Sequence, residues 1–309
     1  MTPTVRPPRP EDFPAIVALG EAFDRALTGT GDWSVEDVAH DWRELADPER
    51  DAWLLEDDGA VVGYATFQDD GEGTFEADGY VHPDRFGRGI GATIVGLTEA
   101  RAAERLSAVE LPRVVLQNAV LHSDAAARAL LEGRGYRPVR HFLRMQIDMD
   151  RPPPAPAWPD GVTVAAFRPD LDAEAVHACV HEAFEDEWSF RAEPFAEWRA
   201  RKLGDPRFDA SLWAVARDGG DVCGAALCTG GQFDMGFVNS LAVRPAWRRR
   251  GLGLALLRQA FTWFWERGEH RVGLGVDTEN PTAALRLYER AGMRAVWQAD
   301  VYEKALRGG

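Results

Sequence analysis

The sequence predicts an α+β fold that is built twice, each copy forming a mixed β-sheet flanked by helices. Strand-like and helix-like segments alternate along the whole chain. Two landmark segments also recur: VHPDRFGRGIG at 81–91 returns as VRPAWRRRGLG at 243–253, and EGRGYRPV at 132–139 returns as ERAGMRAV at 289–296. Because both pairs are separated by nearly the same length of chain, they indicate an internal duplication.

A proline-rich stretch separates the two copies. Five prolines lie between Arg151 and Asp160, and proline cannot donate a hydrogen bond to a sheet ladder. Such a composition is typical of a stiff, extended spacer. We therefore predict an N-terminal domain at 1–150, a linker at 151–160 and a C-terminal domain at 161–309.

The elements of the first copy follow from apolar spacing and turn residues. Short apolar runs predict strands, and apolar residues three and four apart predict helices. Two of the strands form a hairpin across Asp57-Asp58-Gly59. The predicted order is strand 4–7, helices 11–27 and 35–45, strands 52–56, 60–67 and 75–81, a helix after Gly91, strand 114–117, helix 123–133 and strand 139–148.

The second copy repeats this order with the same signals. Its predicted elements are strand 162–167, helices 172–184 and 194–203, strands 212–217, 221–228 and 235–243, helix 251–267, strand 271–276, helix 281–291 and a final strand pair near 294–305.

Composition and charge narrow the class of protein. With 45% hydrophobic and 28% charged residues, the chain is an ordinary globular protein. A net charge of −15 argues against nucleic acid as a partner, since phosphate backbones require a broad cationic surface. Cys179, Cys223 and Cys228 lack metal-ligand spacing and fit a reduced cytoplasm. No segment is typical of a signal peptide or a membrane span, so no membrane partner is expected.

The stretch 237–257 has the pattern of an anion site. Phe237 to Val243 is predicted as a buried strand that Arg244-Pro245 ends. Arginines and glycines at 248–253 then lead into a helix. The first amides of a helix lack internal partners, the helix dipole adds partial positive charge there, and glycine lets the backbone approach an anion. The arrangement predicts a turn that binds a diphosphate.

The residues of this turn indicate which diphosphate. A kinase-type loop would have Lys-Ser/Thr where Leu254-Ala255 stands, and a dinucleotide fold would have a third glycine at Leu256. The turn resembles the coenzyme A loop of the GCN5-related N-acetyltransferases, with the pattern Arg/Gln-x-x-Gly-x-Gly/Ala. Arg248, Gly251 and Gly253 match it in register.

A second signature lies downstream, and the resemblance covers nearly all of 161–306. The run from Asn280 through Tyr288 to Gly292 is similar to the family's Asn-x-x-Ala segment followed by Tyr and Gly. The resemblance implies two tandem acyl-CoA N-acyltransferase domains that use acetyl-CoA as co-substrate and no metal. The two-copy layout is similar to that of the mycothiol synthase-like branch. The implied coenzyme-binding residues are Leu241, Ala242, Val243, Arg248, Arg249, Arg250, Gly251, Leu252, Gly253, Leu254, Asn280 and Ala283.

The resemblance also implies the chemistry, which is direct attack of an amine on the thioester. It implies a bulge in the central strand that leaves a backbone N–H near Leu241 to Ala242 to meet the carbonyl oxygen. Tyr288 matches the family acid that protonates the departing thiolate. Ala284, Leu287 and Ala291 share its helix face, so its ring should point inward. A core tyrosine with a satisfied hydroxyl is the alternative.

The base that deprotonates the amine is less well indicated. Many relatives carry a carboxylate on the central strand, and the glutamate of the mycothiol synthase-like branch falls at Phe237 here. We predict Asp277 and Glu187 as candidates, acting directly or through water. Glu185 and Asp186 lie beside Glu187, and the three together also fit a solvated acidic loop. Asp277 could equally cap the helix that carries Tyr288.

The first copy departs from the pattern at three positions. Phe86 stands in the place of Arg248, Ser123 in that of Asn280 and Leu131 in that of Tyr288. Gly89 and Gly91 remain, so a backbone cradle could still form. We interpret this half as degenerate, either binding acyl-CoA weakly or bracing the other half.

The sequence therefore predicts a small-molecule N-acetyltransferase that acts at its C-terminal domain on a primary amine. Trp188, Phe190 and Trp198 near the acidic loop would suit a cationic acceptor, or else belong to the core. Arginines and a lysine nearby would instead suit an acceptor with an anionic group. The alternatives are a non-catalytic acyl-CoA-binding or scaffolding protein, a mycothiol synthase and a protein-lysine acetyltransferase. Either a monomer or a homodimer is expected.

Overall fold

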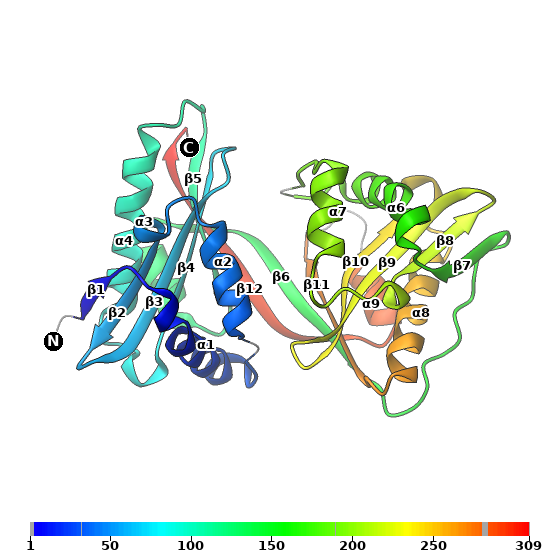
Figure 1. Cartoon of the computed structure of the whole chain (residues 1–309), viewed down its shortest axis with the longest axis horizontal. Coiled ribbons are helices and arrows are strands. Elements are labelled where there is room, and N and C mark those ends of the chain that lie inside the picture. The colour runs from blue at the N-terminus through cyan, green and yellow to red at the C-terminus, as the bar shows by residue number, and fades with distance from the viewer. Residues whose placement is uncertain (1–2, 32, 189, 280–283, 309) are drawn as a thin grey trace. The chain divides into compact units, whose positions relative to one another are not determined.

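The computed structural model describes residues 3–31, 33–188, 190–279 and 284–308. They form two compact units (Figure 1). The first comprises Met1–Phe142 and Trp297–Gly309, and the second comprises Leu143–Val296. Each unit contains a mixed sheet and flanking helices, so the prediction of two tandem α+β copies is confirmed.

The first unit has the sheet order β1-β2-β3-β4-β5-β12. Its strands are antiparallel except for the parallel pairing of β4 with β5. Its elements are β1 (Thr4–Arg6), α1 (Phe13–Thr28), α2 (Val35–Glu44), α3 (Pro48–Asp51), β2 (Ala52–Asp57), β3 (Ala60–Asp69), β4 (Thr74–Val81), α4 (Ile90–Leu106), β5 (Val114–Leu121), α5 (Ala125–Gly133), the start of β6 (Arg137–Asp148) and most of β12 (Arg294–Arg307).

The second unit has the sheet order β6-β11-β10-β9-β8-β7, to which β6 contributes its second half. Two helices, α6 and α8, pack against the central strands β9 and β10. Besides the later half of β6, its elements are β7 (Val162–Ala166), α6 (Pro169–Phe184), α7 (Phe195–Leu203), β8 (Ala214–Asp218), β9 (Asp221–Gln232), β10 (Met235–Val243), α8 (Leu252–Glu266), β11 (Arg271–Asp277) and α9 (Ala284–Arg290).

The last strand of the chain completes the sheet of the first unit. β12 pairs with β5 from Ala299 opposite Leu121 to Arg307 opposite Val114. The predicted strand pair near 294–305 is wrong, because 294–307 is one continuous strand. This segment contains neither glycine nor proline to turn the chain. The first compact unit therefore includes the last strand of the chain, and the second includes the later half of β6. The domain boundaries at 150 and 161 remain a prediction.

The core of the second unit includes the three cysteines. Cys179, Cys223 and Cys228 are fully buried and free. Burial raises the pKa of the Cys228 thiol well above its usual value, so this side chain is an inert apolar packing group. Trp198 is 2% exposed and belongs to the same core, which removes it from the predicted aromatic contacts of the acceptor.

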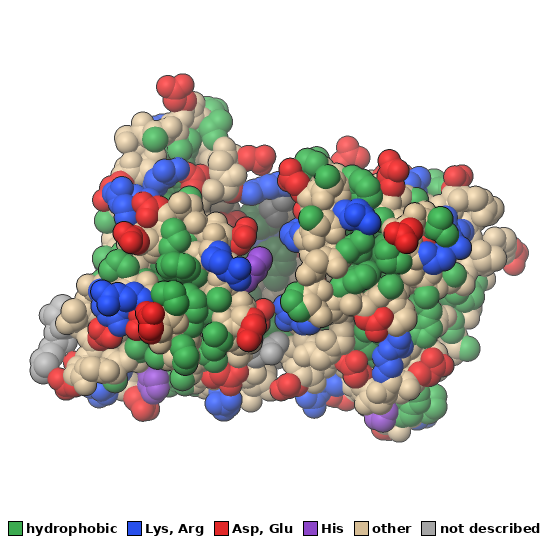
Figure 2. Space-filling model, viewed as in Figure 1, with side chains coloured by type: hydrophobic (Ala, Val, Ile, Leu, Met, Phe, Trp, Pro, Cys, Tyr) green, Lys and Arg blue, Asp and Glu red, His purple; other side chains and the backbone are tan. Residues whose placement is uncertain are grey.

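The surface of both units carries charges of both signs (Figure 2). None of the helices in the described part of the chain is long and apolar enough to cross a bilayer.

Candidate active site

The predicted diphosphate turn lies between β10 and α8. A 3-10 turn at Pro245–Trp247 follows the strand, and α8 begins at Leu252. Gly251 precedes the helix in the left-handed region, at φ +87° and ψ −4°, and a methyl group built on it would meet nothing within 4 Å. The first amides of α8 therefore face open space, and Gly251 supplies the left-handed backbone that leads into the helix. We call this turn, Gly251 with the first amides of α8, the anion cradle, because such amides can bind an anion.

The first unit forms the same turn. Gly89 precedes α4 at φ +83° and ψ −1°, within a few degrees of Gly251. Two residues earlier, Gly87 has φ +73° where the second unit has Arg249 at φ +61°. The backbone cradle is thus present in both copies, although the first lacks the arginine of the motif.

Arg248 uses its guanidinium to fix the turn. It donates a hydrogen bond of 2.9 Å to the carbonyl oxygen of Ala183, at the end of α6, and one of 3.3 Å to that of Val243. The Asp186 carboxylate lies 3.9 Å away. Arg249 and Arg250 are exposed, so they are the arginines of the turn whose charge faces solvent.

The central strand of the second unit is bulged at Asn239. Val238 lies opposite Cys228 and Ser240 lies opposite Leu227, so Asn239 is the extra residue. The bulge lies two residues before Leu241. Leu241, Ala242 and Val243 pair regularly with β9. On the other edge, the described pairing of β10 with β11 is limited to Gly236 and Phe237. The strands diverge beyond Phe237, which leaves the β11-facing edge of Leu241 and Val243 for an added strand.

The first unit differs at this point. The pairing of β3 with β4, described over its whole length, runs from Gly63 opposite Val81 to Asp69 opposite Phe75 without a shift. Counting back from the shared turn reaches Phe75, but the extra residue Asn239 shifts the second strand by one, so Glu76 corresponds to Phe237 in the pairing with the preceding strand. The copies therefore share the cradle and differ in the strand beside it.

Tyr288 is placed by α9, which is docked on the start of α8. The Leu287 Cδ1 atom lies 2.9 Å from the position of a methyl group on Gly253, so this glycine allows the two helices to touch. Tyr288 is 8% exposed, as its helix face predicts. Burial raises its pKa well above the usual value and the Glu187 carboxylate adds to the shift, so the phenol stays protonated at neutral pH.

The two predicted bases lie on different segments. Glu187, in the turn after α6, is near enough to Tyr288 to influence its pKa. Asp277 ends β11, and its carboxylate accepts a hydrogen bond of 2.9 Å from the backbone N–H of Glu279. Two predicted coenzyme contacts, Asn280 and Ala283, lie outside the described residues.

Two polar groups near the site were missed by sequence reasoning. The Gln232 side-chain oxygen accepts hydrogen bonds from Thr229 (2.7 Å) and from the bulged Asn239 (3.0 Å). On α6, the rings of His177 and His181 lie 4.0 Å apart, and burial followed by the His177 charge lowers the pKa of His181. Their spacing of four along a predicted helix was the available signal.

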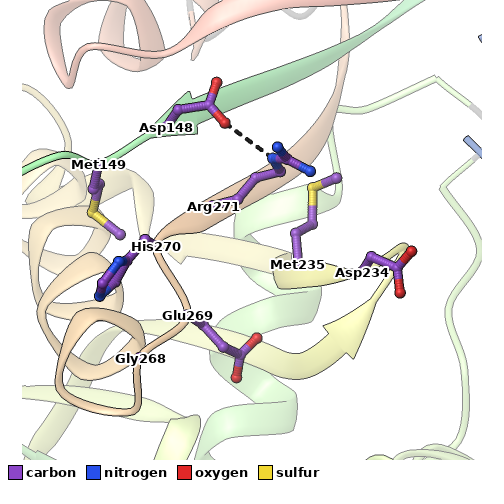
Figure 3. Close-up of a pocket in the computed structure, with 8 residues that line it drawn as sticks. All are labelled: Asp148, Met149, Asp234, Met235, Gly268, Glu269, His270 and Arg271. Atoms are coloured by element: carbon purple, nitrogen blue, oxygen red, sulfur yellow. Dashed lines mark hydrogen bonds and ion pairs between the residues drawn. The ribbon is translucent and has the colours of Figure 1, made fainter. Parts of the chain in front are cut away.

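A cavity of about 380 Å³ lies at the opposite end of these strands (Figure 3). It is lined by the start of β10 and β11, including Met235 and Arg271, whereas the cradle follows the end of β10. Asp148 points toward Arg271 and pairs with it at 3.0 Å. This cavity is therefore separate from the predicted coenzyme site. Within the described ranges, no cluster of three or more His, Cys, Asp or Glu side chains has a metal-binding arrangement.

The comparison with known families agrees with this geometry. The model of the "Acetyltransferase (GNAT) family" matches twice, at residues 17–136 and 174–293. The chain belongs to this family, and it is an acyltransferase with two tandem copies of the fold.

Curated relatives match the chain over most of its length. The chain is 34% identical over 274 residues to the mycothiol acetyltransferase of Salinispora arenicola, covering 85% of this chain and 84% of the relative. It is 31% identical over 257 residues to that of Thermobispora bispora, covering 80% and 81%.

Solved structures extend the likeness to the whole chain. A GCN5-related N-acetyltransferase from Sphaerobacter thermophilus superposes with a TM-score of 0.85 at 35% identity, covering 99% of this chain and 96% of that one. A tandem GNAT protein from the clavulanic acid biosynthesis pathway gives a TM-score of 0.75 at 18% identity and 98% coverage of both chains, which shows the shared fold alone.

Proposed function

We propose that the second unit transfers an acetyl group from acetyl-CoA to the primary amine of a small molecule by direct attack on the thioester. The observation that carries the proposal is the buried Tyr288 on a helix docked against the cradle helix at Gly253. The first unit has Leu131 in place of this phenol and a strand without the bulge. The second unit therefore combines an anion cradle, a diverging strand edge and a proton donor.

Different residues bind the coenzyme and transfer the proton in the proposed reaction. Acetyl-CoA supplies an activated acyl group. The amides from Gly251 to Leu254 hold the diphosphate, and Leu241 and Val243 offer a strand edge to the pantetheine arm. Tyr288, kept protonated by burial, donates its proton to the departing sulfur.

The incoming ammonium must lose a proton before it attacks. Glu187 and Asp277 are the carboxylates proposed for this step, directly or through water. Glu187 is the better supported of the two, because its charge already acts on the Tyr288 phenol. Asn280 and Ala283 remain proposed coenzyme contacts from the family pattern.

Thiol release from acetyl-CoA with a panel of amines tests the proposal. Replacing Tyr288 with Phe should lower kcat by about a hundredfold and leave the Kd of coenzyme A nearly unchanged. Tyr302→Phe is the matched control, because it removes another buried phenol, one that donates to Glu132 in the first unit. Normal turnover by the Tyr288 variant would contradict the acid role, and failure of every amine would contradict the proposed reaction.

The curated relatives favour a second candidate, acetylation in mycothiol synthesis. Phe237 stands at the position that we assign to the strand glutamate of that branch. The mycothiol precursor and a lysine peptide are therefore separate arms of the amine panel. A kcat/KM for the precursor far above that of other amines would support this candidate.

A further inference from the structure

The bulged residue of β10 is held by side chains of β9. Asn239 is the extra residue of the strand and is exposed, yet its amide group is bonded on both sides. Its Nδ2 atom donates a hydrogen bond of 3.0 Å to the side-chain oxygen of Gln232, and its Oδ1 atom lies 3.0 Å from the hydroxyl of Thr229. The Thr229 hydroxyl also lies 2.7 Å from the Gln232 oxygen. These three side chains form a closed triangle, which we call the bulge network.

Thr229 is the buried member of the bulge network. It is 8% exposed, whereas Gln232 is half-buried and Asn239 is exposed. A hydroxyl carries one proton, so Thr229 shares this proton between the two amide oxygens, while the Asn239 amide donates to Gln232. Polar networks of this kind rigidify the elements that carry them. The buried hydroxyl therefore orients both amides.

The backbone ladder is short where the bulge network acts. Register shifts lie on both sides of Phe237 and Val238, so only these two residues pair in register between the shifts. Asn239, as the extra residue, has no residue opposite it in the described pairing. A slip by one residue along such a strand would turn the side chains that follow to the other face. Thr229 lies opposite Phe237, so its contact with Asn239 links the paired residues to the bulge.

The first unit has a different residue at the position of Thr229. Gln68 pairs with Glu76 there, as Thr229 pairs with Phe237 in the second unit. The described pairing of β3 with β4 contains no shift, so this strand pair has no extra residue to hold. The threonine therefore accompanies the bulge and not the fold that the two copies share.

We propose that Thr229 is a positioning residue for acetyl transfer. Through the bulge network it fixes the bulge of β10, and the bulge aims the backbone N–H near Leu241 to Ala242 at the carbonyl oxygen of the thioester. This inference rests on the proposed function, since it concerns the same reaction. Thr229 acts through the backbone and not by contact with the substrate. A donor must be preorganised where the oxyanion develops, and a misplacement of about 1 Å can cost about a hundredfold in rate.

Substitutions that keep the shape of the threonine test the proposal. Thr229→Val removes the hydroxyl and should lower kcat by about tenfold or more, with the KM for acetyl-CoA nearly unchanged. Thr229→Ser retains the hydroxyl and should keep most of the wild-type kcat. The amine with the highest turnover in the acceptor panel serves as the substrate. An unchanged kcat in Thr229→Val, or equal losses in the two variants, would overturn the proposal while the amine acetyltransferase stands.

A double variant tests whether the threonine acts through the bulge network. Asn239→Ala removes the amide that the hydroxyl holds, so Thr229→Val combined with Asn239→Ala should lower kcat about as much as the more damaging single change. Losses that multiply would contradict a shared mechanism. Thr98→Val is the matched control, because Thr98 is a fully buried threonine of the first unit whose hydroxyl donates to the carbonyl oxygen of Val95. It should leave kcat unchanged.

Hydrogen exchange gives a second readout that does not depend on turnover. In the protein without coenzyme, Thr229→Val should speed the exchange of backbone amides at 237–243, whereas Thr229→Ser and Thr98→Val should leave it as in the wild type. Unchanged exchange in Thr229→Val would overturn the proposal. Faster exchange in a protein that acetylates no amine would support the hold of Thr229 on the bulge and contradict the proposed reaction instead.

Discussion

Leu287 packs over the α-carbon of Gly253, with its Cδ1 atom 2.9 Å from where a methyl group on that glycine would lie. The contact places α9, and with it Tyr288, against the first turn of α8. In the first unit the equivalent distance, from Gly91 to Leu130, is 3.5 Å, an ordinary van der Waals contact. The second glycine of the motif therefore serves helix packing, while Gly251 keeps the cradle open.

Gly253→Ala should consequently impair the second unit. The added methyl group requires the Leu287 side chain to turn aside, at a cost of about 1 kcal/mol in the free energy of unfolding, and kcat should fall because the neighbouring Tyr288 shifts with it. Gly91→Ala is the matched control and should be neutral or stabilising by up to about 1 kcal/mol. Chemical denaturation and steady-state kinetics measure both. Equal effects of the two substitutions would show that the Leu287 contact is not decisive.

Gly251→Ala tests the cradle itself. Nothing lies within 4 Å of the added methyl group, so the cost is the left-handed backbone, about 1–2 kcal/mol for a residue other than glycine. The loop should relax and the KM for acetyl-CoA should rise. Gly89→Ala imposes the same strain on the first unit and should leave this KM unchanged if only the second unit uses coenzyme. A rise in both variants would assign the first cradle a part in coenzyme binding.

Much of the fold and of the site is local in origin, and the sequence predicts it. The turn at 248–253 forms as expected, because Pro245 restricts the backbone before it and Gly251 allows the left-handed conformation that begins the helix. Tyr288 is buried because its helix repeats apolar residues on one face. The hairpin at 57–59 likewise follows from turn chemistry. In each case the determining residues are neighbours in the chain.

The parts that could not be predicted depend on distant partners. Nothing in the segment 294–307 indicates that it pairs with β5, because an apolar alternation does not specify which edge it joins. The stacking of Arg144 on Phe233 joins residues that are far apart in sequence. The bulge follows from the family pattern, but its position at Asn239 depends on the register with β9.

The Asp300 carboxylate predicts a pH-dependent stability of the first unit. Its side chain is 3% exposed on β12 and lies within 2.8 Å of the Nδ1 atoms of both His122 and His141. Burial by itself raises its pKa, but hydrogen bonds from Gln298 and the two histidines outweigh this and lower it below the usual value. The ionised form is therefore stabilised by folding.

Asp300→Asn should then lower the stability of the first unit at pH 7 by about 1–3 kcal/mol. A lowered pKa contributes stability above the unfolded value near 4 and loses it as the pH falls through the folded value. The difference in Tm between wild type and variant should thus shrink below pH 4. Asp172→Asn in the second unit should show the same pH dependence. Burial raises the pKa of Asp172, but Arg168 and Arg217 outweigh this and lower it. A Tm difference between wild type and variant that grows as the pH falls would contradict the predicted direction.

Removal of residues 297–309 should unfold the first unit and spare the second. β12 supplies the strand beside β5, and its Tyr302 is 2% exposed in the core of that unit. The second unit keeps its own edge strand, the later part of β6, whose neighbour Met149 donates a 2.7 Å hydrogen bond to His270. Hydrogen exchange by mass spectrometry should show loss of protection in β4 and β5 and retained protection in β9 and β10.

The point variant Tyr302→Ala gives the same test without shortening the chain, since it leaves the strand in place and removes a core aromatic at a cost of about 3–5 kcal/mol. Protection should fall in β4 and β5 for this variant too, whereas Tyr302→Phe, which loses only the hydrogen bond to Glu132, should have a small effect. Equal loss of protection in both units would mean that they unfold together. In that case the loss of packing at β12 would affect both cores, and the chain would unfold as one cooperative unit.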